Sequence, residues 1–214
     1  LGEVWLCSGQ SNMEWTPMSN IDNRDEEIAA ANHPDIRFFH IPKRGAITPQ
    51  NNCEASWATC TPDVMKNTSA VAYFFGRNLQ KDLNVPIGLI VSAWGGTPAE
   101  VWTPEERVIE NPQIRDAMPD KTYPWWPVEP GVLYNQMINP IVPYSLAGAI
   151  WYQGESNRDH PDSYGILLKT MIESWRKSFK KDFPFYLVQI APHTYNSGDN
   201  GAALVREHQE WVSR

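Results

Sequence analysis

Short apolar runs alternate along the chain with longer segments that carry one apolar face. Four runs read as strands: residues 4–7, 87–93, 147–152 and 185–190. Each has four to seven residues and is rich in Val, Ile, Leu and aromatic side chains, which is typical of buried strands. Because the apolar residues are continuous, the pattern favours a parallel sheet covered on both faces.

Between these runs the apolar residues recur every three or four positions, which predicts helices. The predicted helices are residues 69–83, 162–181, 202–214 and a short one at 24–31. Ser69 and Asp162 are the expected N-caps of the first two. Residues 103–132, rich in Pro and Trp, are expected to form a long irregular excursion, and loops of that length usually shape a site or a partner surface.

Alternating strands and helices predict an α/β fold. We expect a three-layer α/β/α domain over residues 1–214, with a mainly parallel, flavodoxin-like sheet. Hydrophobic residues make up 42% of the chain and charged residues 20%, which excludes disorder as the dominant state. No apolar window is long enough to span a membrane. The net charge is −7 and no basic run occurs, which argues against nucleic-acid binding.

Polar residues cluster just after each predicted strand, at positions 8–13, 94–97, 153–157 and 191–193. In open α/β sheets, ligands bind outside the carboxyl ends of the strands, so these segments are expected to meet. The chain has no glycine-rich phosphate loop, which makes a nucleotide cofactor unexpected, and no His/Cys cluster that reads as a metal site. We therefore predict neither a cofactor nor a metal.

Ser11 is the candidate nucleophile, because it follows the first strand at a turn that Gly9 permits. The first amides of a helix beginning there would point at a developing oxyanion. An N–H of Gly95 or Gly96 and the side-chain amide of Gln153 are candidates for further oxyanion donors.

Structural interpretations compete with this one. A serine after a strand is most often a helix cap. Ser156 has the same placement as Ser11 and is a rival nucleophile. Neither serine fits Gly-x-Ser-x-Gly, because the fifth position is Met13 in one case and Arg158 in the other. The structural interpretation of Glu155 is an ion pair with a nearby cation.

Three motifs carry a family resemblance: Gly-Gln-Ser-Asn-Met at 9–13, Gly-Gly-Thr at 95–97 and Trp-Tyr-Gln-Gly-Glu-Ser at 151–156. With residues 133–157 and 205–209, they closely resemble the sialate O-acetylesterase family, a branch of the SGNH hydrolases related to carbohydrate acetylesterases. The resemblance spans nearly the whole chain, with the motifs in the right order.

The resemblance implies that Ser11 is the acyl nucleophile. It implies an oxyanion hole made of the N–H groups of Ser11 and Gly95 and the side chain of Gln153, with Glu155 ordering the site. The residues expected to contact substrate are the neighbours of these groups: Gln10, Asn12, Trp94 and Gly96. The Trp-rich excursion is expected to line the sugar side.

The family's base is a His in an Asp-x-x-His motif, which does not occur in this sequence. We expect that the chain is a segment of a longer protein and that this motif lies beyond it. His193, at a strand exit, is the candidate base within the chain, although the family pattern does not use that position. His33 and His208 are expected to be solvated or packed.

The sequence thus predicts a serine esterase that removes O-acetyl groups from a carbohydrate, such as a sialic acid or another acetylated glycan. The alternative is a non-catalytic glycan-binding module with a degenerate site. Acetylated glycans indicate a periplasmic or extracellular location, and no oligomeric state is predicted. Cys53 and Cys60 are spaced either to bridge a short loop or to remain free.

Overall fold

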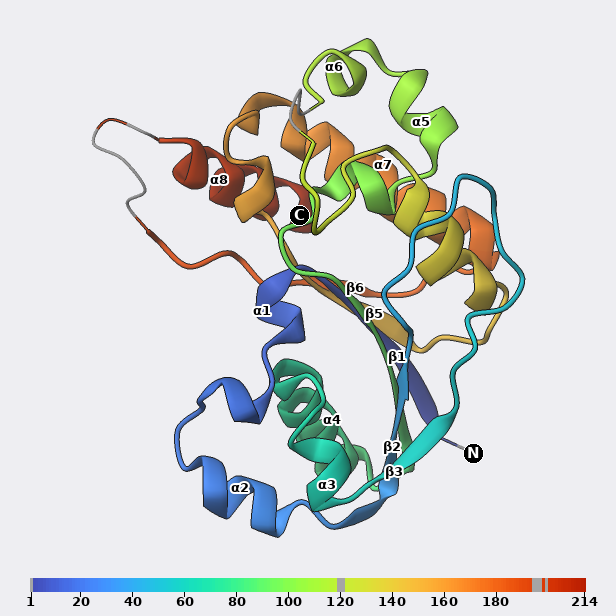
Figure 1. The fold of residues 1–214 in the computed structure, drawn as a ribbon, viewed down its shortest axis with the longest axis vertical. Coiled ribbons are helices and arrows are strands. Elements are labelled where there is room, and N and C mark those ends of the chain that lie inside the picture. Colours follow the sequence, from blue (N-terminus) through green and yellow to red (C-terminus); the bar gives the residue numbers. More distant parts are fainter. Residues whose placement is uncertain (1, 119–121, 194–197, 199) are drawn as a thin grey trace.

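One six-stranded sheet forms the centre of the molecule, in the order β3-β2-β4-β1-β5-β6 (Figure 1). The structure, a computed structural model, describes residues 2–118, 122–193, 198 and 200–214. The strands are β1 (Glu3–Gly9), β2 (His33–His40), β3 (Trp57–Cys60), β4 (Ile87–Ala93), β5 (Gly148–Tyr152) and β6 (Phe185–Leu187). Five strands are parallel, and β3 pairs antiparallel with β2 at one edge.

Helices cover both faces of this sheet (Figure 1). The α-helices are α1 (Ser11–Glu14), α2 (Arg24–Ala30), α3 (Pro62–Met65), α4 (Ala70–Leu83), α5 (Glu105–Ile109), α6 (Pro112–Arg115), α7 (Pro161–Phe179) and α8 (Gly201–Ser213). Single turns of other helix types are η1 (Pro17–Ser19), η2 (Ala99–Trp102), η3 (Tyr134–Ile138), η4 (Asn139–Ile141) and η5 (Glu155–Asn157).

Alternate side chains of β1 enter two separate cores. Leu6 packs with the residues beneath α7 and α8, whereas Trp5 and Cys7 pack with those beneath α4. This confirms the predicted three-layer α/β/α class with a mainly parallel sheet. The strand order differs from that of flavodoxin at one place: the first two parallel strands, β1 and β2, are not neighbours here, because β4 lies between them.

The four predicted strands are present, and the last is shorter than expected, ending at Leu187. Two strands were missed. In β2 only Ile36 and Phe38 are buried, and the other residues of the strand, Phe39 among them, are exposed or half-buried. A strand with so few apolar residues gives little periodic signal.

The two expected caps have different outcomes. Ser69 caps α4, since its Oγ accepts the N–H of Ala72 at 3.1 Å. The expectation for Asp162 is wrong: α7 begins one residue earlier, at Pro161. Proline suits a first helical position because its φ is already helical and its missing N–H would have no partner there.

The remaining expectations concern the loops. The excursion at 103–132 contains the short helices α5 and α6, while its residues 119–121 lie outside the described part of the chain. Cys53 and Cys60 are free thiols. They cannot meet because Cys53 packs in the core beneath α7 and Cys60 in the core beneath α4, on opposite faces of the sheet.

Gly9 is the glycine that the tight exit from β1 requires. Its φ is +143°, and a Cβ placed on it would lie 2.2 Å from the carbonyl oxygen of Tyr152. We expect Gly9→Ala to lower the free energy of unfolding by about 1–3 kcal/mol, because the backbone has to move. The urea midpoint at unchanged m-value measures this loss.

Gly45→Ala is the matched control for that substitution. A Cβ there meets its first neighbour, the Cβ of Val132, at an ordinary 3.7 Å. The control should unfold at the wild-type urea concentration. Equal midpoints for the two variants would contradict the steric role of Gly9.

Candidate active site

Ser11 lies just beyond the carboxyl end of β1, as the first residue of α1. After the turn at Gly9, the N–H of Gln10 donates to the carbonyl of Tyr152 at 3.0 Å. Ser11 thereby reaches the sheet edge where β1 is flanked by β4 and β5. Its side chain is exposed, and no described residue hydrogen-bonds to its hydroxyl or its backbone N–H. Both groups are therefore accessible to a ligand.

The glycine turn after β4 lies against Ser11. A Cβ placed on Gly95 would lie 3.2 Å from the Ser11 Cβ. The N–H of Gly95 donates to one carboxylate oxygen of Glu14, whose other oxygen pairs with Lys43. The expected oxyanion donor of Gly95 is therefore occupied by a carboxylate in this structure.

Gly96, the second glycine of the turn, faces a cavity instead. Its φ is +80°, and the indole of Trp126 packs so closely that an added Cβ would lie 2.6 Å from the ring. Among the described residues, nothing accepts a hydrogen bond from its N–H. Of the two glycines, Gly96 is thus the one whose N–H has no acceptor among the described residues.

The side chain of Gln153 is fully buried. Its Nε2 donates to Asn157 Oδ1 at 2.7 Å and to the carbonyl of Thr97 at 3.3 Å, and its Oε1 accepts the Tyr164 hydroxyl at 3.1 Å. Both amide hydrogens are used in this way. The structure therefore places Gln153 as a link between the loops after β4 and β5, not as an open oxyanion donor.

Asn157 extends this link to a buried carboxyl group. Its Oδ1 also accepts the N–H of Ala99 at 2.9 Å, and its Nδ2 donates to Glu100 Oε2 at 2.9 Å. Glu100 is fully buried, and its Oε1 has no partner among the described residues. Burial raises the pKa of the Glu100 carboxyl, because an apolar environment disfavours its charged form.

Gln10, which was expected to contact substrate, contacts the protein in this structure. The residue is only 4% exposed, and its Oε1 accepts the N–H groups of Gly154 and Ser156, both at 3.3 Å. A buried side-chain oxygen that satisfies two backbone donors fixes the local backbone. Gln10 therefore holds the turn after β5 beside Ser11.

Asn12 is likewise engaged with the protein. Its Nδ2 donates to Glu155 Oε1 at 2.6 Å, while Glu155 Oε2 is buried with no partner among the described residues. Glu155 thus holds the side chain of Asn12, the residue next to Ser11. The side-chain amide of Asn12, expected to bind substrate, is used for this contact.

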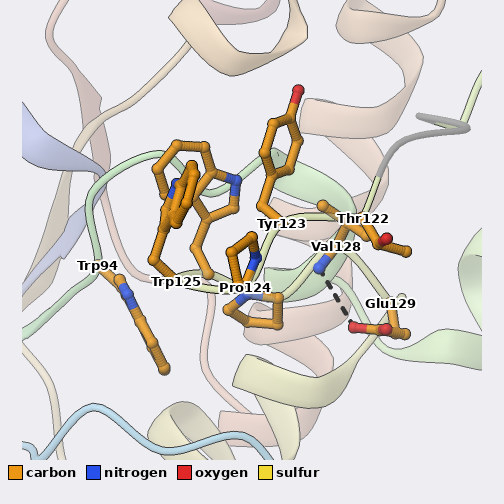
Figure 2. A pocket seen from close by; sticks show the side chains of 9 residues that line it. Trp94, Thr122, Tyr123, Pro124, Trp125, Val128 and Glu129 are labelled. Carbon is orange, nitrogen blue, oxygen red and sulfur yellow. Dashed lines mark hydrogen bonds between the residues drawn. The ribbon is translucent and has the colours of Figure 1, made fainter.

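A cavity of about 510 Å³, the inner cavity, opens beside these groups. Its lining comprises Gly96, Pro98, Tyr123, Trp126, Val128, Glu155, Ser156, Arg158, Asp159 and His160. A second cavity of about 230 Å³, the outer cavity, is lined by Trp94 and residues 122–129 (Figure 2). Trp94, expected to contact substrate, therefore belongs to the outer cavity.

The other expected residues are more scattered. Ser156 lines the inner cavity, as does His160, whereas His193 is exposed. Among the described residues, no histidine hydrogen-bonds to Ser11. His33 packs near the Tyr73 ring, with its Nε2 3.2 Å from the hydroxyl, and His208 packs over Gly165, which confirms packed roles for both.

Four residues of the site escaped the sequence interpretation: Glu14, Lys43, Glu100 and Asn157. Asn157 ends a polar run that had been noted, and Glu14 lies three residues after Ser11, so both carried a signal. Glu100, a lone acid among apolar neighbours, carried a weaker one. Lys43 lies in a loop, and nothing in its sequence surroundings connects it to Ser11.

The exposed Ser11 lies at the carboxyl edge of a parallel sheet, where open α/β folds bind their ligands. Residues 1–213 match the carbohydrate esterase family of sialic acid-specific acetylesterases. The chain belongs to this family.

Within the described ranges, no His, Cys, Asp and Glu side chains group to hold a metal ion, and no helix has the length and apolarity needed to cross a membrane.

The similar proteins include sialate O-acetylesterases and a carbohydrate acetylesterase. The sialate O-acetylesterases of Homo sapiens and Mus musculus are each 34% identical to the chain over 97% of its length, covering 43% and 47% of their own. A carbohydrate acetylesterase from Xanthomonas citri has a similar structure, with a TM-score of 0.86 and 35% sequence identity. The match covers 99% of this chain and 47% of that one. The chain thus spans less than half the length of these relatives.

An Arabidopsis thaliana protein shares the fold at 16% identity. Its TM-score is 0.61, with 99% of this chain and 81% of that one covered.

Burial of Glu100 makes stability depend on pH. In the unfolded chain this acid ionises above a pH of about 4.3, whereas the folded state keeps it protonated to higher pH. The folded state then binds more protons, so stability falls as pH rises through the window between the two pKa values. In Glu100→Gln, the amide oxygen can still accept from Asn157 without ionising. We expect the stability of this variant to decline less than that of wild type from acidic to neutral pH, measured by urea unfolding.

Glu26→Gln is the matched control, because Glu26 is exposed in α2. Its stability curve should run parallel to that of the wild type. Parallel curves for Glu100→Gln and wild type would show instead that Glu100 is ionised in the folded protein.

Proposed function

We propose that the chain carries the nucleophile and the oxyanion donors of a serine esterase that removes O-acetyl groups from a carbohydrate. The observation that carries this is the exposed Ser11 hydroxyl, together with the N–H groups of Ser11 and Gly96, which have no partner among the described residues. Gly96 follows Gly95, on which a Cβ would lie 3.2 Å from the Ser11 Cβ. Membership of a family of carbohydrate esterases supports the same reaction class.

In the proposed reaction, Ser11 Oγ attacks the acetyl carbonyl carbon of the substrate. The N–H groups of Ser11 and Gly96 stabilise the resulting oxyanion. Collapse of this intermediate breaks the ester bond, releases the sugar hydroxyl and leaves acetyl-Ser11. Water then attacks the acetyl group, giving acetate and free Ser11.

Gly95 and Gln153 have supporting roles in this proposal. Gly95 fixes the glycine turn through its N–H contact with Glu14, and Gln153 holds that turn's continuation at Thr97. The inner cavity, with Tyr123 and Trp126 in its wall, receives the acetylated sugar. A sialic acid is one such sugar, and acetylated glycans place the protein in the periplasm or outside the cell.

The proton acceptor is proposed to be a histidine of the family's Asp-x-x-His motif, outside residues 1–214. This part of the proposal rests on the sequence, which contains no Asp-x-x-His motif. With the base outside residues 1–214, turnover by these residues alone should be slow relative to that of the longer protein, because a serine without its base is a weak nucleophile.

Acetate release from 4-nitrophenyl acetate tests the nucleophile. In the longer protein, Ser11→Ala should lower kcat by about 10³-fold or more, since the attacking atom is lost. Ser156→Ala is the matched control, because Ser156 is the rival serine and lines the inner cavity, and it should retain turnover.

Loss of turnover in Ser156→Ala but not in Ser11→Ala would assign the reaction to Ser156. Binding of acetylated sugars without Ser11-dependent turnover in the longer protein would favour a glycan-binding module. Fast Ser11-dependent turnover by residues 1–214 alone would show that the base lies within them, with His160 and His193 as the residues to replace next.

A further inference from the structure

The inner and outer cavities adjoin each other. Tyr123, Trp126 and Val128 line both cavities, so the two spaces share one wall. Ligand pockets for small molecules usually have about 300–1,000 Å³. The inner cavity, at about 510 Å³, falls in this range, and the outer cavity, at about 230 Å³, extends it.

The inner cavity borders the proposed reaction centre through residues next to Ser11, which is not itself in the lining. Gly96, which offers the open N–H, lines it, and so does Glu155, which accepts the side-chain amide of Asn12 at 2.6 Å. A sugar whose acetyl group reaches Ser11 therefore occupies the inner cavity. Anything attached to that sugar on the side of Trp126 meets the outer cavity.

Three aromatic rings, Tyr123, Trp125 and Trp126, form a patch along this continuation. Their ring centroids lie 4.8 Å apart for Tyr123 and Trp126, 5.4 Å for Trp125 and Trp126, and 6.3 Å for Tyr123 and Trp125. Trp125 is nevertheless 60% exposed. Figure 2 shows Trp125 on the same side of the outer cavity as Trp94, with Thr122 and Glu129 on the other side. The patch thus holds a large apolar face open to solvent, next to the site.

The chemistry of the outer cavity favours a neutral, partly apolar ligand. Among the described residues, no Lys or Arg lines it, so this part of the wall offers no guanidinium or ammonium to a phosphate or carboxylate. The one charged group among its described lining residues, Glu129, accepts the N–H of Val128 at 3.2 Å. Pyranose rings match such a surface, because their C–H faces pack on aromatic rings while their hydroxyls remain in water.

We propose that the aromatic patch binds a second, neutral sugar unit adjacent to the acetylated one, so that the preferred substrate is an acetylated oligosaccharide and not a free acetylated sugar. This inference rests on the proposed esterase function. The proposed occupant of the outer cavity is a sugar, because this cavity adjoins the space where the acetylated sugar would lie.

The test compares long and short substrates in the longer protein. Two pairs are used: acetylated xylotetraose against acetylated xylose, and O-acetylated sialyllactose against free O-acetylated sialic acid. The wild type should show a higher kcat/KM for the longer member of at least one pair. Trp125→Ala should reduce that long-to-short ratio about tenfold, the scale of one lost aromatic contact. Because Trp125 is largely exposed, we expect the variant to fold normally.

Trp211→Ala is the matched control, since Trp211 is 51% exposed on α8 and lines neither cavity. Its ratio should equal that of the wild type. Equal kcat/KM for long and short substrates in the wild type, or an unchanged ratio in Trp125→Ala, would overturn the second sugar unit. Failure of the proposed function is a separate result: no Ser11-dependent release of acetate from 4-nitrophenyl acetate.

Discussion

The side chain of Asn157 connects the parts of the site that come from different strands. Its Oδ1 accepts one hydrogen bond from Gln153, after β5, and another from the backbone of Ala99, after β4. Its Nδ2 donates to the buried Glu100. Loops at the end of a parallel sheet have no ladder to hold them, so buried side chains with satisfied hydrogen bonds have to take that role.

The third loop, which carries Ser11, is attached by a different set of contacts. Gln10 accepts two backbone N–H groups of the turn after β5, and Glu14 accepts the N–H of Gly95 after β4. These contacts surround Ser11 without involving its own hydroxyl or N–H. The result is a fixed position for groups that remain open, which is the preorganisation that oxyanion stabilisation requires.

Sequence reasoning recovered the central strands because they are apolar on both faces, and it located the site because polar residues cluster where those strands end. It missed β2, whose buried residues are only Ile36 and Phe38. It placed Gln10 and Gln153 at the substrate, whereas both are buried links. An amide side chain can donate to a ligand or to the backbone, and the choice depends on which neighbours the fold brings within 3 Å or so. Spacing along the chain does not contain that information.

Amide hydrogen exchange in Asn157→Ala tests the central claim that this side chain holds the site together. The account predicts faster exchange at Ala99 and along the glycine turn at 95–97, together with slower acetate release, while the amides of β1 and β4 keep their protection. Unchanged exchange at Ala99 and the glycine turn, with wild-type turnover, would show that the loops hold their positions without Asn157 and would contradict the account.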